Sequence, residues 1–499
     1  MEILTNIAYG FTVALSPVNL LYAFLGALLG TIIGVLPGLG PVATISILLP
    51  ITFSLPPQSA LIMLAGIYYG AQYGGSTTAI LVNLQGESSS VVTAIDGYQM
   101  ARQGRAGPAL ATAACASFFA GTIATFVIAL AAPPLAEVAL TFGPADYCSL
   151  MIFGLVSAVI LAHGSILKAI GMILLGILLG TVGIDVNTSV PRYTFGMPQF
   201  GDGIDFAVIA MGLFGIGETI NNLTRAPEQR GYVRDFKGLM PTRADFRQML
   251  PPALRGTLLG AALGILPGGG PVLSAFSAYS FEKKISRTPE RFGKGAIEGV
   301  AAPEAANNAA AQTSFIPLLT LGLPSSAVMG LMIGALMMQG IHPGPQLVNE
   351  KPDLFWGLIA SMWLGNLMLL VLNLPLVGVW ARLLILPYRI LYPAILLICC
   401  IGVYSINKSS LDVLIASLFG LLGFLLYRLR CEPAPLLLGF ILGPMIEENM
   451  RRALLITKGD FSVFVTRPIS LSFLIMTAAL IVVLAAPLVQ SARERAFQG

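Results

Sequence analysis

The chain has 499 residues, of which 56% are hydrophobic and 10% charged, with a mean hydropathy of +0.82 and a net charge of +4. Soluble domains carry roughly 25% charged residues, so this composition excludes an ordinary cytosolic enzyme, and the hydrophobicity excludes a disordered chain. No Asp, Glu, Lys or Arg occurs in residues 3–86, 305–349, 354–381 and 468–492. Because one membrane crossing needs about 20 apolar residues, these runs predict an all-α, polytopic helical membrane protein.

The apolar segments predict hairpins and spans in chain order. Residues 19–36 and 42–54 form a re-entrant or broken helical hairpin, followed by ordinary spans near 109–131, 147–162, 166–184 and 204–222. A second hairpin at 251–266 and 272–281 is followed by spans near 356–380, 390–405, 411–427 and 433–449. A last span at 469–491 precedes a basic tail that carries Arg493 and Arg495.

Two stretches of sequence recur in the same order. Residues 34–41 (GVLPGLGP) return as residues 264–271 (GILPGGGP), and residues 83–89 align with residues 320–326. Such self-similarity indicates internal duplication. It divides the chain into a first transmembrane repeat (1–224), a basic linker (225–250), a second transmembrane repeat (251–450) and a C-terminal part with a loop, the final helix and the tail (451–499).

Charge predicts that the two repeats are inverted. The basic linker is placed in the cytoplasm by the positive-inside rule. Residues 97–108 carry Arg102 and Arg105, whereas their counterpart 334–345 carries no Lys or Arg. The opposite holds for residues 283–294, which are basic, and residues 51–60, which are uncharged. Corresponding loops are therefore expected on opposite sides of the membrane, as in many secondary transporters. The basic residues between 451 and 467 fit this topology poorly, since they fall in a predicted periplasmic loop.

The repeated Pro-Gly loops predict helix breaks at membrane depth, because proline interrupts the helical ladder and glycine allows positive φ. Exposed backbone there must line protein or a wet cavity. The loops are either plain hairpin tips or tips that reach a binding site, and in the second case their carbonyls could hold Na⁺, with Gly38, Gly40, Gly268 and Gly270 as candidates. The loop residues are Pro37, Gly38, Gly40, Pro267, Gly268, Gly269 and Gly270.

A polar cluster follows each hairpin. Each cluster ends in residue types typical of a helix N-terminus, such as Ser or Pro. Free N–H groups and the positive dipole end of a helix suit a carboxylate. The alternative is that these polar side chains only join helices, at about 0.6 kcal/mol each. Because the cluster is duplicated, we predict a substrate site made of Thr77, Thr78, Asn83, Gly86, Glu87, Ser88, Ser89, Ser90, Asn307, Asn308, Thr313, Gly322, Pro324, Ser325 and Ser326.

Acidic residues in apolar surroundings are candidates for ion coupling. Glu87 lies at predicted membrane depth, where an ionisable group is functional by default; it carries a coupling proton or caps its helix. Asp96 is expected to pair with Arg102 and Arg105 at the membrane surface. Glu218 and Glu447 are candidates for a structural or a coupling role. Glu298 and Glu304 are expected to face a cytoplasmic vestibule.

Enzyme signatures are absent from the sequence. His163 and His342 are the only histidines, and neither an H-E-x-x-H zinc motif nor a phosphate-binding P-loop occurs. A serine hydrolase would need a base beside its serine, yet His163 is predicted at a cytoplasmic end far from Ser88, and His342 is predicted in a periplasmic loop beside Pro343 with a structural role. The sequence therefore predicts that the protein is not an enzyme and holds no cofactor other than Na⁺ or H⁺ as a coupling ion.

The motifs resemble those of the TctA family, the large membrane subunit of bacterial tripartite tricarboxylate transporters. The resemblance covers essentially the whole chain and rests on GVLPGLGP, YGGSTTAILVNLQGESSSVVTAIDGYQMARQGRAG, GILPGGGP and LGLPSS. One departure is Gln85, which stands where the N-x-P-G-E stretch of the family has proline.

This resemblance implies a binding-protein-dependent secondary transporter in the bacterial inner membrane. Its implied partners are a small four-span membrane subunit and a periplasmic substrate-binding protein. The implied activity is import of a di- or tricarboxylate such as citrate, by Na⁺ or H⁺ symport and without ATP. A gated anion channel with the same hairpins is the alternative.

Overall fold

The structure is a computed structural model that describes residues 2–36, 38–84, 86–161, 165–185, 188–224, 238, 240–268, 270–384 and 388–485. Several residues singled out from the sequence lie outside this part of the chain: Pro37, Gln85, His163, Gly269, Arg493, Arg495 and residues 225–237 and 239 of the basic linker.

The chain is built almost entirely of helices. Before the linker it forms α1 (Glu2–Ala14), α2 (Pro17–Val35), α3 (Pro41–Phe53), α4 (Pro57–Val82), α5 (Ser90–Met100), η1 (Ala101–Arg105), α6 (Ala106–Ala139), α7 (Pro144–Leu161), α8 (Ile166–Gly180), β1 (Gly183–Ile184), β2 (Pro191–Arg192), η2 (Pro198–Phe200), α9 (Phe206–Ala210), η3 (Met211–Ile216) and α10 (Gly217–Leu223). Strands β1 and β2 pair in antiparallel fashion.

After the linker the chain is again helical. It forms α11 (Arg243–Ile265), α12 (Gly270–Ile285), η4 (Pro289–Arg291), α13 (Glu298–Thr313), α14 (Phe315–Leu321), α15 (Ala327–Met338), α16 (Leu347–Glu350), α17 (Pro352–Asn373), α18 (Val377–Leu383), α19 (Tyr388–Asn407), α20 (Ser410–Arg428), α21 (Ala434–Ile456), α22 (Val463–Thr466) and α23 (Pro468–Ala485).

The predicted fold class is confirmed. Within the described residues, five helical segments are long and apolar enough to cross a membrane: Pro17–Val35, Ser90–Ala139, Phe206–Leu223, Pro352–Asn373 and Ser410–Arg428. Shorter apolar helices accompany them, including α7, α8 and α23. The protein is an all-α, polytopic membrane protein.

Several segments differ from the predicted boundaries: α11 begins at Arg243, inside the predicted linker, and α21 continues to Ile456. The predicted loop at 97–108 is helical instead, because α5 continues through the π-helical η1 into α6, with a kink at Gly104 (φ 79°). Glycine adopts this left-handed conformation without steric cost. The predicted span 356–380 is split into α17 and α18. Pro375 explains this break, since proline has no backbone N–H to donate to the preceding turn and its ring clashes with the carbonyl of that turn.

Both predicted hairpins are present, and each packs against a later helix of its own half in the same way. A Cβ added to Gly26, Gly30 or Gly34 of α2 would lie 2.3–2.5 Å from a backbone carbonyl oxygen of α4, at Met63, Ile67 and Ala71. In α11, Gly256, Gly260 and Gly264 approach Ala302, Ala306 and Ala310 of α13 equally closely. Small residues of this kind let helix backbones approach within a membrane. The α2–α4 and α11–α13 pairs are therefore equivalent structural units.

The equivalence also corrects the alignment of the two polar clusters. Ala71 and Ala310 are equivalent, because each lies against the last glycine of its hairpin helix. Twelve residues after each of them lie Asn83 and Gly322, so Asn83 corresponds to Gly322 and not to Thr320. Both residues end a helix in the left-handed conformation, with φ of 57° and 65°. In this register Glu87 corresponds to Ser326. The second cluster therefore has a hydroxyl at the position where the first cluster has a carboxylate.

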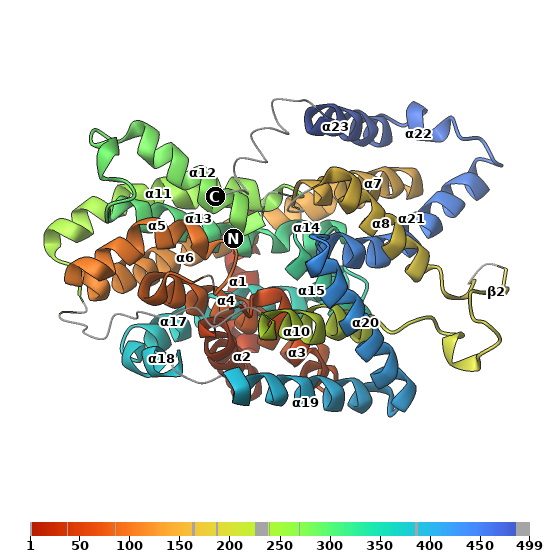
Figure 1. Cartoon of the computed structure of the whole chain (residues 1–499). Helices are drawn as coiled ribbons and strands as arrows, with labels where there is room; N and C mark the ends of the chain where they lie inside the picture. The colour runs from red at the N-terminus through yellow and green to blue at the C-terminus, as the bar shows by residue number, and fades with distance from the viewer. Residues whose placement is uncertain are drawn as a thin grey trace.

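The helices form two groups on either side of the α2–α4 pair. Figure 1 shows α5, α6, α11, α12 and α13 gathered at one end of the molecule, and α7, α8, α21 and α23 at the other. The β1–β2 segment projects from that second end (Figure 1). Helix α13 packs between α6, α11 and α12, so its side chains reach elements of both halves.

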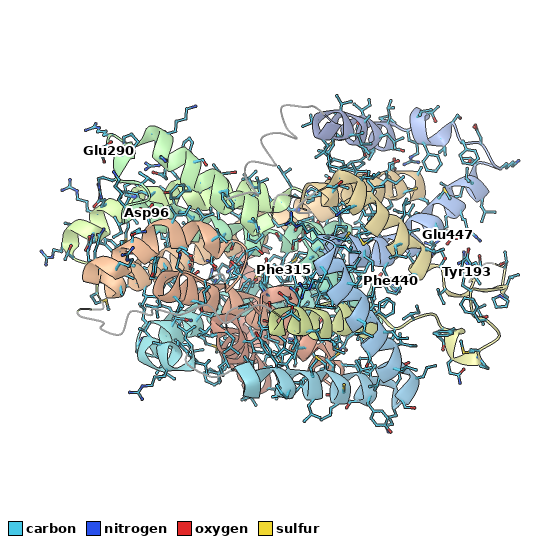
Figure 2. The ribbon with its side chains drawn as sticks, viewed as in Figure 1. Asp96, Tyr193, Glu290, Phe315, Phe440 and Glu447 are labelled. Carbon is cyan, nitrogen blue, oxygen red and sulfur yellow. The ribbon has the colours of Figure 1, made fainter. Side chains whose placement is uncertain are left out.

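Segments that the sequence assigns to one side of the membrane contact each other. Arg105 forms an ion pair with Asp245 at 2.5 Å, which joins residues 97–108 to the linker end. Gln103 donates to the carbonyl oxygen of Lys294 at 2.8 Å. Figure 2 shows Asp96 and Glu447 toward opposite edges of the molecule. The assignment of one edge to the cytoplasm, and with it the inversion of the repeats, stays a prediction.

The arginines that fit the topology poorly are paired with acids. Arg451 lies 3.0 Å from Asp185 and 2.6 Å from Glu447. Arg192, on β2, contacts the same Glu447 at 2.9 Å. Arg467 pairs with Asp146 at 2.6 Å, and Arg452 pairs with Glu448. These contacts give Glu447 a structural role and hold the β1–β2 segment against α21.

Candidate functional site

The first polar cluster forms a tight turn between α4 and α5. Gly86 lies so close to α4 that an added Cβ would be 2.4 Å from the Cα atom of Gly75. Because of this close approach, the buried side chain of Glu87 packs against Gly75. The hydroxyl of Ser89 donates to the carboxylate of Glu87. Ser90 donates to the carbonyl oxygen of Glu87 at 2.8 Å. The start of α5 is therefore already next to a carboxylate of the chain itself.

The second cluster forms the start of α15 and carries no acid. Ser326 is the N-cap of α15 and accepts a hydrogen bond from the backbone N–H of Met329 at 3.3 Å. The neighbouring Ser325 is 1% exposed, and its hydroxyl has no hydrogen-bond partner among the residues that the structure describes. Its carbonyl oxygen accepts from the backbone N–H of Gly268, at the tip of the second hairpin, at 3.2 Å. A buried, free hydroxyl thus lies at a helix N-terminus beside a hairpin tip.

The predicted asparagines connect the first cluster to the second half. Asn307 of α13 donates to Ser89 at 3.1 Å, and Asn308 donates to the side-chain oxygen of Asn307 at 2.5 Å. Both asparagines are buried. Among the described residues no hydrogen bond joins Glu87–Ser90 directly to Ser325 or Ser326, so the two clusters are not in direct polar contact.

The network continues from Asn308 to Glu304, which is completely buried. Asn308 donates to Ser117 of α6 at 2.8 Å, and Ser117 donates to Glu304 at 3.1 Å. Ser76 of α4 and Thr93 of α5 donate to the same carboxylate at 2.7 and 2.5 Å. Glu304 thus draws together α4, α5, α6 and α13, and does not face an open vestibule.

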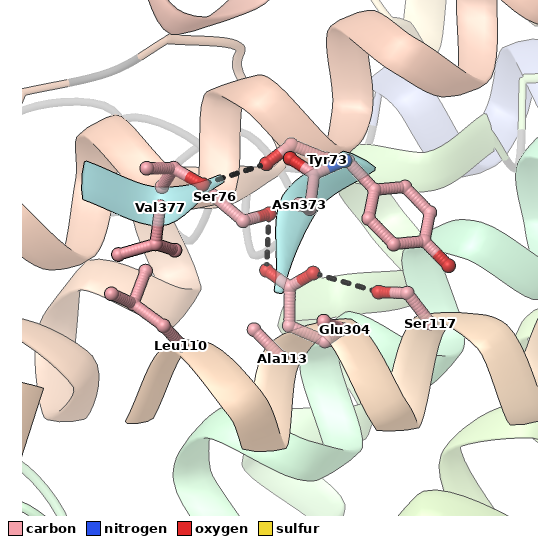
Figure 3. Close-up of a pocket in the computed structure, with 10 residues that line it drawn as sticks. Tyr73, Ser76, Leu110, Ala113, Ser117, Glu304, Asn373 and Val377 are labelled. Carbon is pink, nitrogen blue, oxygen red and sulfur yellow. Dashed lines mark hydrogen bonds between the residues drawn. The ribbon is translucent and has the colours of Figure 1, made fainter. Parts of the chain in front are cut away.

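A small cavity borders Glu304 (Figure 3). Its volume is about 10 Å³, close to the space that one water molecule needs. A di- or tricarboxylate does not fit in it. Its polar lining consists of Tyr73, Ser76, Thr77, Ser117, Glu304 and Asn373.

The remaining predicted residues differ in their burial and in their hydrogen-bond partners. The hydroxyl of Thr78 donates to the carbonyl oxygen of Val35 at 2.6 Å and so ties α4 to the end of α2. Thr313 donates to Ala309 of its own helix at 3.1 Å. Asn83 and Ser88 are exposed, whereas Gly322 and Pro324 are buried beside Ser325. Thr78 thus has the helix-joining role that was the alternative interpretation, whereas the hydroxyl of Thr313 is satisfied within α13.

The backbone at the hairpin tips is largely engaged by the protein. Gly38 has φ 83°, and its carbonyl oxygen accepts from the side chain of Asn222 at 2.8 Å. The carbonyl oxygens of Gly40 and Gly270 accept from the hydroxyls of Thr44 and Ser274, at 2.9 and 2.8 Å. Pro267 and Gly268 form the second turn. No cation is needed to satisfy the carbonyls of Gly38, Gly40 and Gly270.

The expectation for Asp96 is wrong. Asp96 is completely buried and contacts neither Arg102 nor Arg105; it accepts the backbone N–H groups of Gly293, Gly295 and Ala296 at 2.8–2.9 Å. Its second oxygen accepts from the hydroxyl of Tyr279 at 2.9 Å. These four donors hold the Asp96 carboxylate in place, and it thereby fixes the turn before α13.

Ser76, Thr93, Ser117 and Asn373 were not identified as site residues from the sequence. Ser117 and Thr93 stand alone among apolar neighbours, a pattern common in helix packing. The sequence feature that could have indicated this site is Glu304 itself, because Asn308 follows it by four residues and so lies on the same face of the helix.

Comparisons with known proteins identify the chain. The sequence profile described as the tripartite tricarboxylate transporter TctA family matches residues 20–438, which include both hairpins and both polar clusters. The chain belongs to the TctA family. It is therefore a multi-pass membrane protein of a tripartite transporter, and such a transporter implies partner subunits. The Glu87 and Glu304 network lies entirely within the TctA match.

Two proteins of Agrobacterium vitis are similar to this TctA chain. One, described as an uncharacterized 52.8 kDa protein in the TAR-I ttuC' 3' region, is 58% identical over 497 residues, covering 100% of this chain and 99% of the relative. The other, an uncharacterized protein in the TAR-II ttuC' 3' region, is 56% identical over 238 residues, covering 48% of this chain and 98% of the relative. No solved structure matches the chain.

Proposed function

We propose that the protein is the large membrane subunit of a secondary transporter in the bacterial inner membrane. It imports a di- or tricarboxylate such as citrate by symport with Na⁺ or H⁺. A small four-span membrane subunit and a periplasmic substrate-binding protein complete the transporter. Membership of the TctA family supports this proposal, as does a polar interior shared by elements of both halves.

The free hydroxyl of Ser325 carries the assignment of the substrate site. A helix N-terminus presents unpaired N–H groups, and α15 has twelve residues, long enough for its dipole to favour an anion. Ser325 adds a buried donor without a partner, and Ser326 stands where the first cluster has Glu87. A substrate carboxylate is therefore bound at Ser325 and Ser326. At the first cluster the carboxylate of Glu87 already accepts from Ser89, so a second anion is disfavoured there.

The experiment is uptake of labelled di- and tricarboxylates into proteoliposomes that contain this chain and its small membrane partner. Uptake should require the periplasmic binding protein and an inward cation gradient. Leakage that needs neither would contradict the proposal and favour a gated anion channel.

Replacement of Ser325 by alanine tests the site. A hydrogen bond to a charged group contributes about 1.5–3 kcal/mol, so Ser325→Ala should raise the KM for uptake about tenfold or more. The matched control is Ser361→Ala, because Ser361 is also buried but donates to the carbonyl oxygen of Leu358 in its own helix. Equal KM values for the two variants would refute the assignment of Ser325.

A further inference from the structure

We propose that the cavity beside Glu304 binds a sodium ion, and that this ion is the one coupled to uptake. The inference rests on the proposed function for the coupling, but the binding itself is argued from the residues that surround the cavity. It places the ion at a carboxylate, and not at the glycine carbonyls of the hairpin tips.

The first argument is the charge of Glu304. Each side-chain partner that the structure gives to this carboxylate is a neutral hydroxyl, from Ser76, Thr93 and Ser117. Neutral donors lower the cost of burying a carboxylate but leave its charge uncompensated. An ionisable group inside a membrane protein normally pairs with an opposite charge or marks an ion path. A bound cation supplies the missing charge.

The second argument is an oxygen atom that has no partner. The side-chain nitrogen of Asn373 donates to the carbonyl oxygen of Leu369 at 2.8 Å, and only the amide nitrogen can make that bond. The orientation of the amide is thereby fixed, and within the described part of the chain the other atom, Oδ1, is buried without a hydrogen-bond partner. Asn373 lines the cavity together with Glu304 (Figure 3). Hard cations are bound by several oxygens at once, and this oxygen adds a ligand to the carboxylate of Glu304.

The third argument is the position of the cavity at a helix end. Asn373 is the last residue of α17, and Val377, at the start of α18, also lines the cavity. The C-terminus of a helix carries the negative end of its dipole and favours cations. In transporters, the ends of broken helices commonly coordinate the coupling ion. The broken α17–α18 segment supplies such an end.

The size of the cavity agrees with a dehydrated ion. A volume of about 10 Å³ is close to that needed by one water molecule, and a bare sodium ion is smaller than water. The hydrogen bonds from Ser117 through Asn308 and Asn307 to Ser89 then connect the ion to Glu87. Occupation of the cavity can thereby influence the first polar cluster.

The test is binding of radioactive sodium to the purified full-length chain in lipid nanodiscs, without any carboxylate. The wild type should bind sodium saturably, and Glu304→Gln should weaken binding at least about tenfold, because charged ligands set the affinity of such sites. Glu298→Gln is the matched control, since Glu298 lies on the same helix and contacts Gln248 and Arg291 outside the cavity. It should bind sodium as the wild type does.

A second variant guards against misfolding of Glu304→Gln. Asn373→Ala leaves the hydroxyl donors of Glu304 in place and should also weaken sodium binding about tenfold. Wild-type affinity in both variants, or no sodium binding to the wild type, would overturn the proposal. Carboxylate uptake driven by protons alone would overturn the sodium site and leave the proposed function intact. Sodium binding at Glu304 without carboxylate uptake would overturn the proposed function and leave the site intact.

Discussion

At the scale of single residues, two buried carboxylates illustrate two different roles. Asp96 accepts hydrogen bonds from three backbone N–H groups and a tyrosine hydroxyl. Three of these donors belong to the backbone of one turn, so the carboxylate holds that turn in place. Glu304 accepts from hydroxyls that can also donate elsewhere or act as ligands, and it borders a cavity. The surroundings therefore give Asp96 a structural role and make Glu304 the proposed ligand of the cation.

The structural role of Asp96 predicts a stability change. Asp96→Ala removes the acceptor of three backbone N–H groups, of which that of Ala296 is buried, and of the buried hydroxyl of Tyr279. A buried group left unpaired costs about 1–3 kcal/mol, so we expect a loss of at least about 2 kcal/mol, seen as faster proteolysis of the segment between α12 and α13. Asp96→Asn is the control, because its side-chain oxygen still accepts the backbone N–H groups. Equal proteolysis of the two variants would contradict this role.

At the scale of helices, the sequence was most informative where the signal is local. Pro and Gly at 34–41 and 264–271 predicted both helix breaks, because their effect on the backbone needs no distant partner. The hydroxyl donors of Glu304 lie 187 to 228 residues away, and no periodicity reveals that they meet. Asp96 was misassigned for the same reason, since Arg102 and Arg105 are near in sequence but Gly293–Ala296 are its partners.

The packing of α2 on α4 predicts the effect of a single methyl group. A Cβ at Gly30 would lie 2.3 Å from the carbonyl oxygen of Ile67, so Gly30→Ala must push the helices apart. Overpacking of this kind costs about 1–3 kcal/mol, measurable as a lower temperature of unfolding in detergent. Gly365→Ala, in α17, is the control, because nothing lies within 4 Å of its added Cβ. The prediction fails if the two variants unfold at the same temperature.

At the scale of the whole molecule, contacts between distant loops agree with one arrangement in the membrane. The linker end, residues 97–108 and residues 293–296 meet at one edge through Arg105, which pairs with Asp245, and Gln103, which donates to Lys294. At the end of α3, the side chain of Gln339 donates to the carbonyl oxygen of Thr52 at 3.0 Å. This contact joins 51–60 to 334–345, two uncharged segments that the sequence assigns to the periplasm.

Inversion of the repeats predicts opposite accessibility for two matched helix ends. Ser54, at the end of α3, and Lys284, near the end of α12, occupy corresponding places after the two hairpins, and both are exposed. In a chain without its five native cysteines, a membrane-impermeant thiol reagent applied to spheroplasts should label Ser54→Cys. Lys284→Cys should be labelled only after the membrane is permeabilised, because basic segments remain in the cytoplasm. Phe195→Cys, in the segment that follows β2, should behave like Ser54→Cys. Labelling of Ser54→Cys and Lys284→Cys from the same side would mean that the two halves are parallel and not inverted.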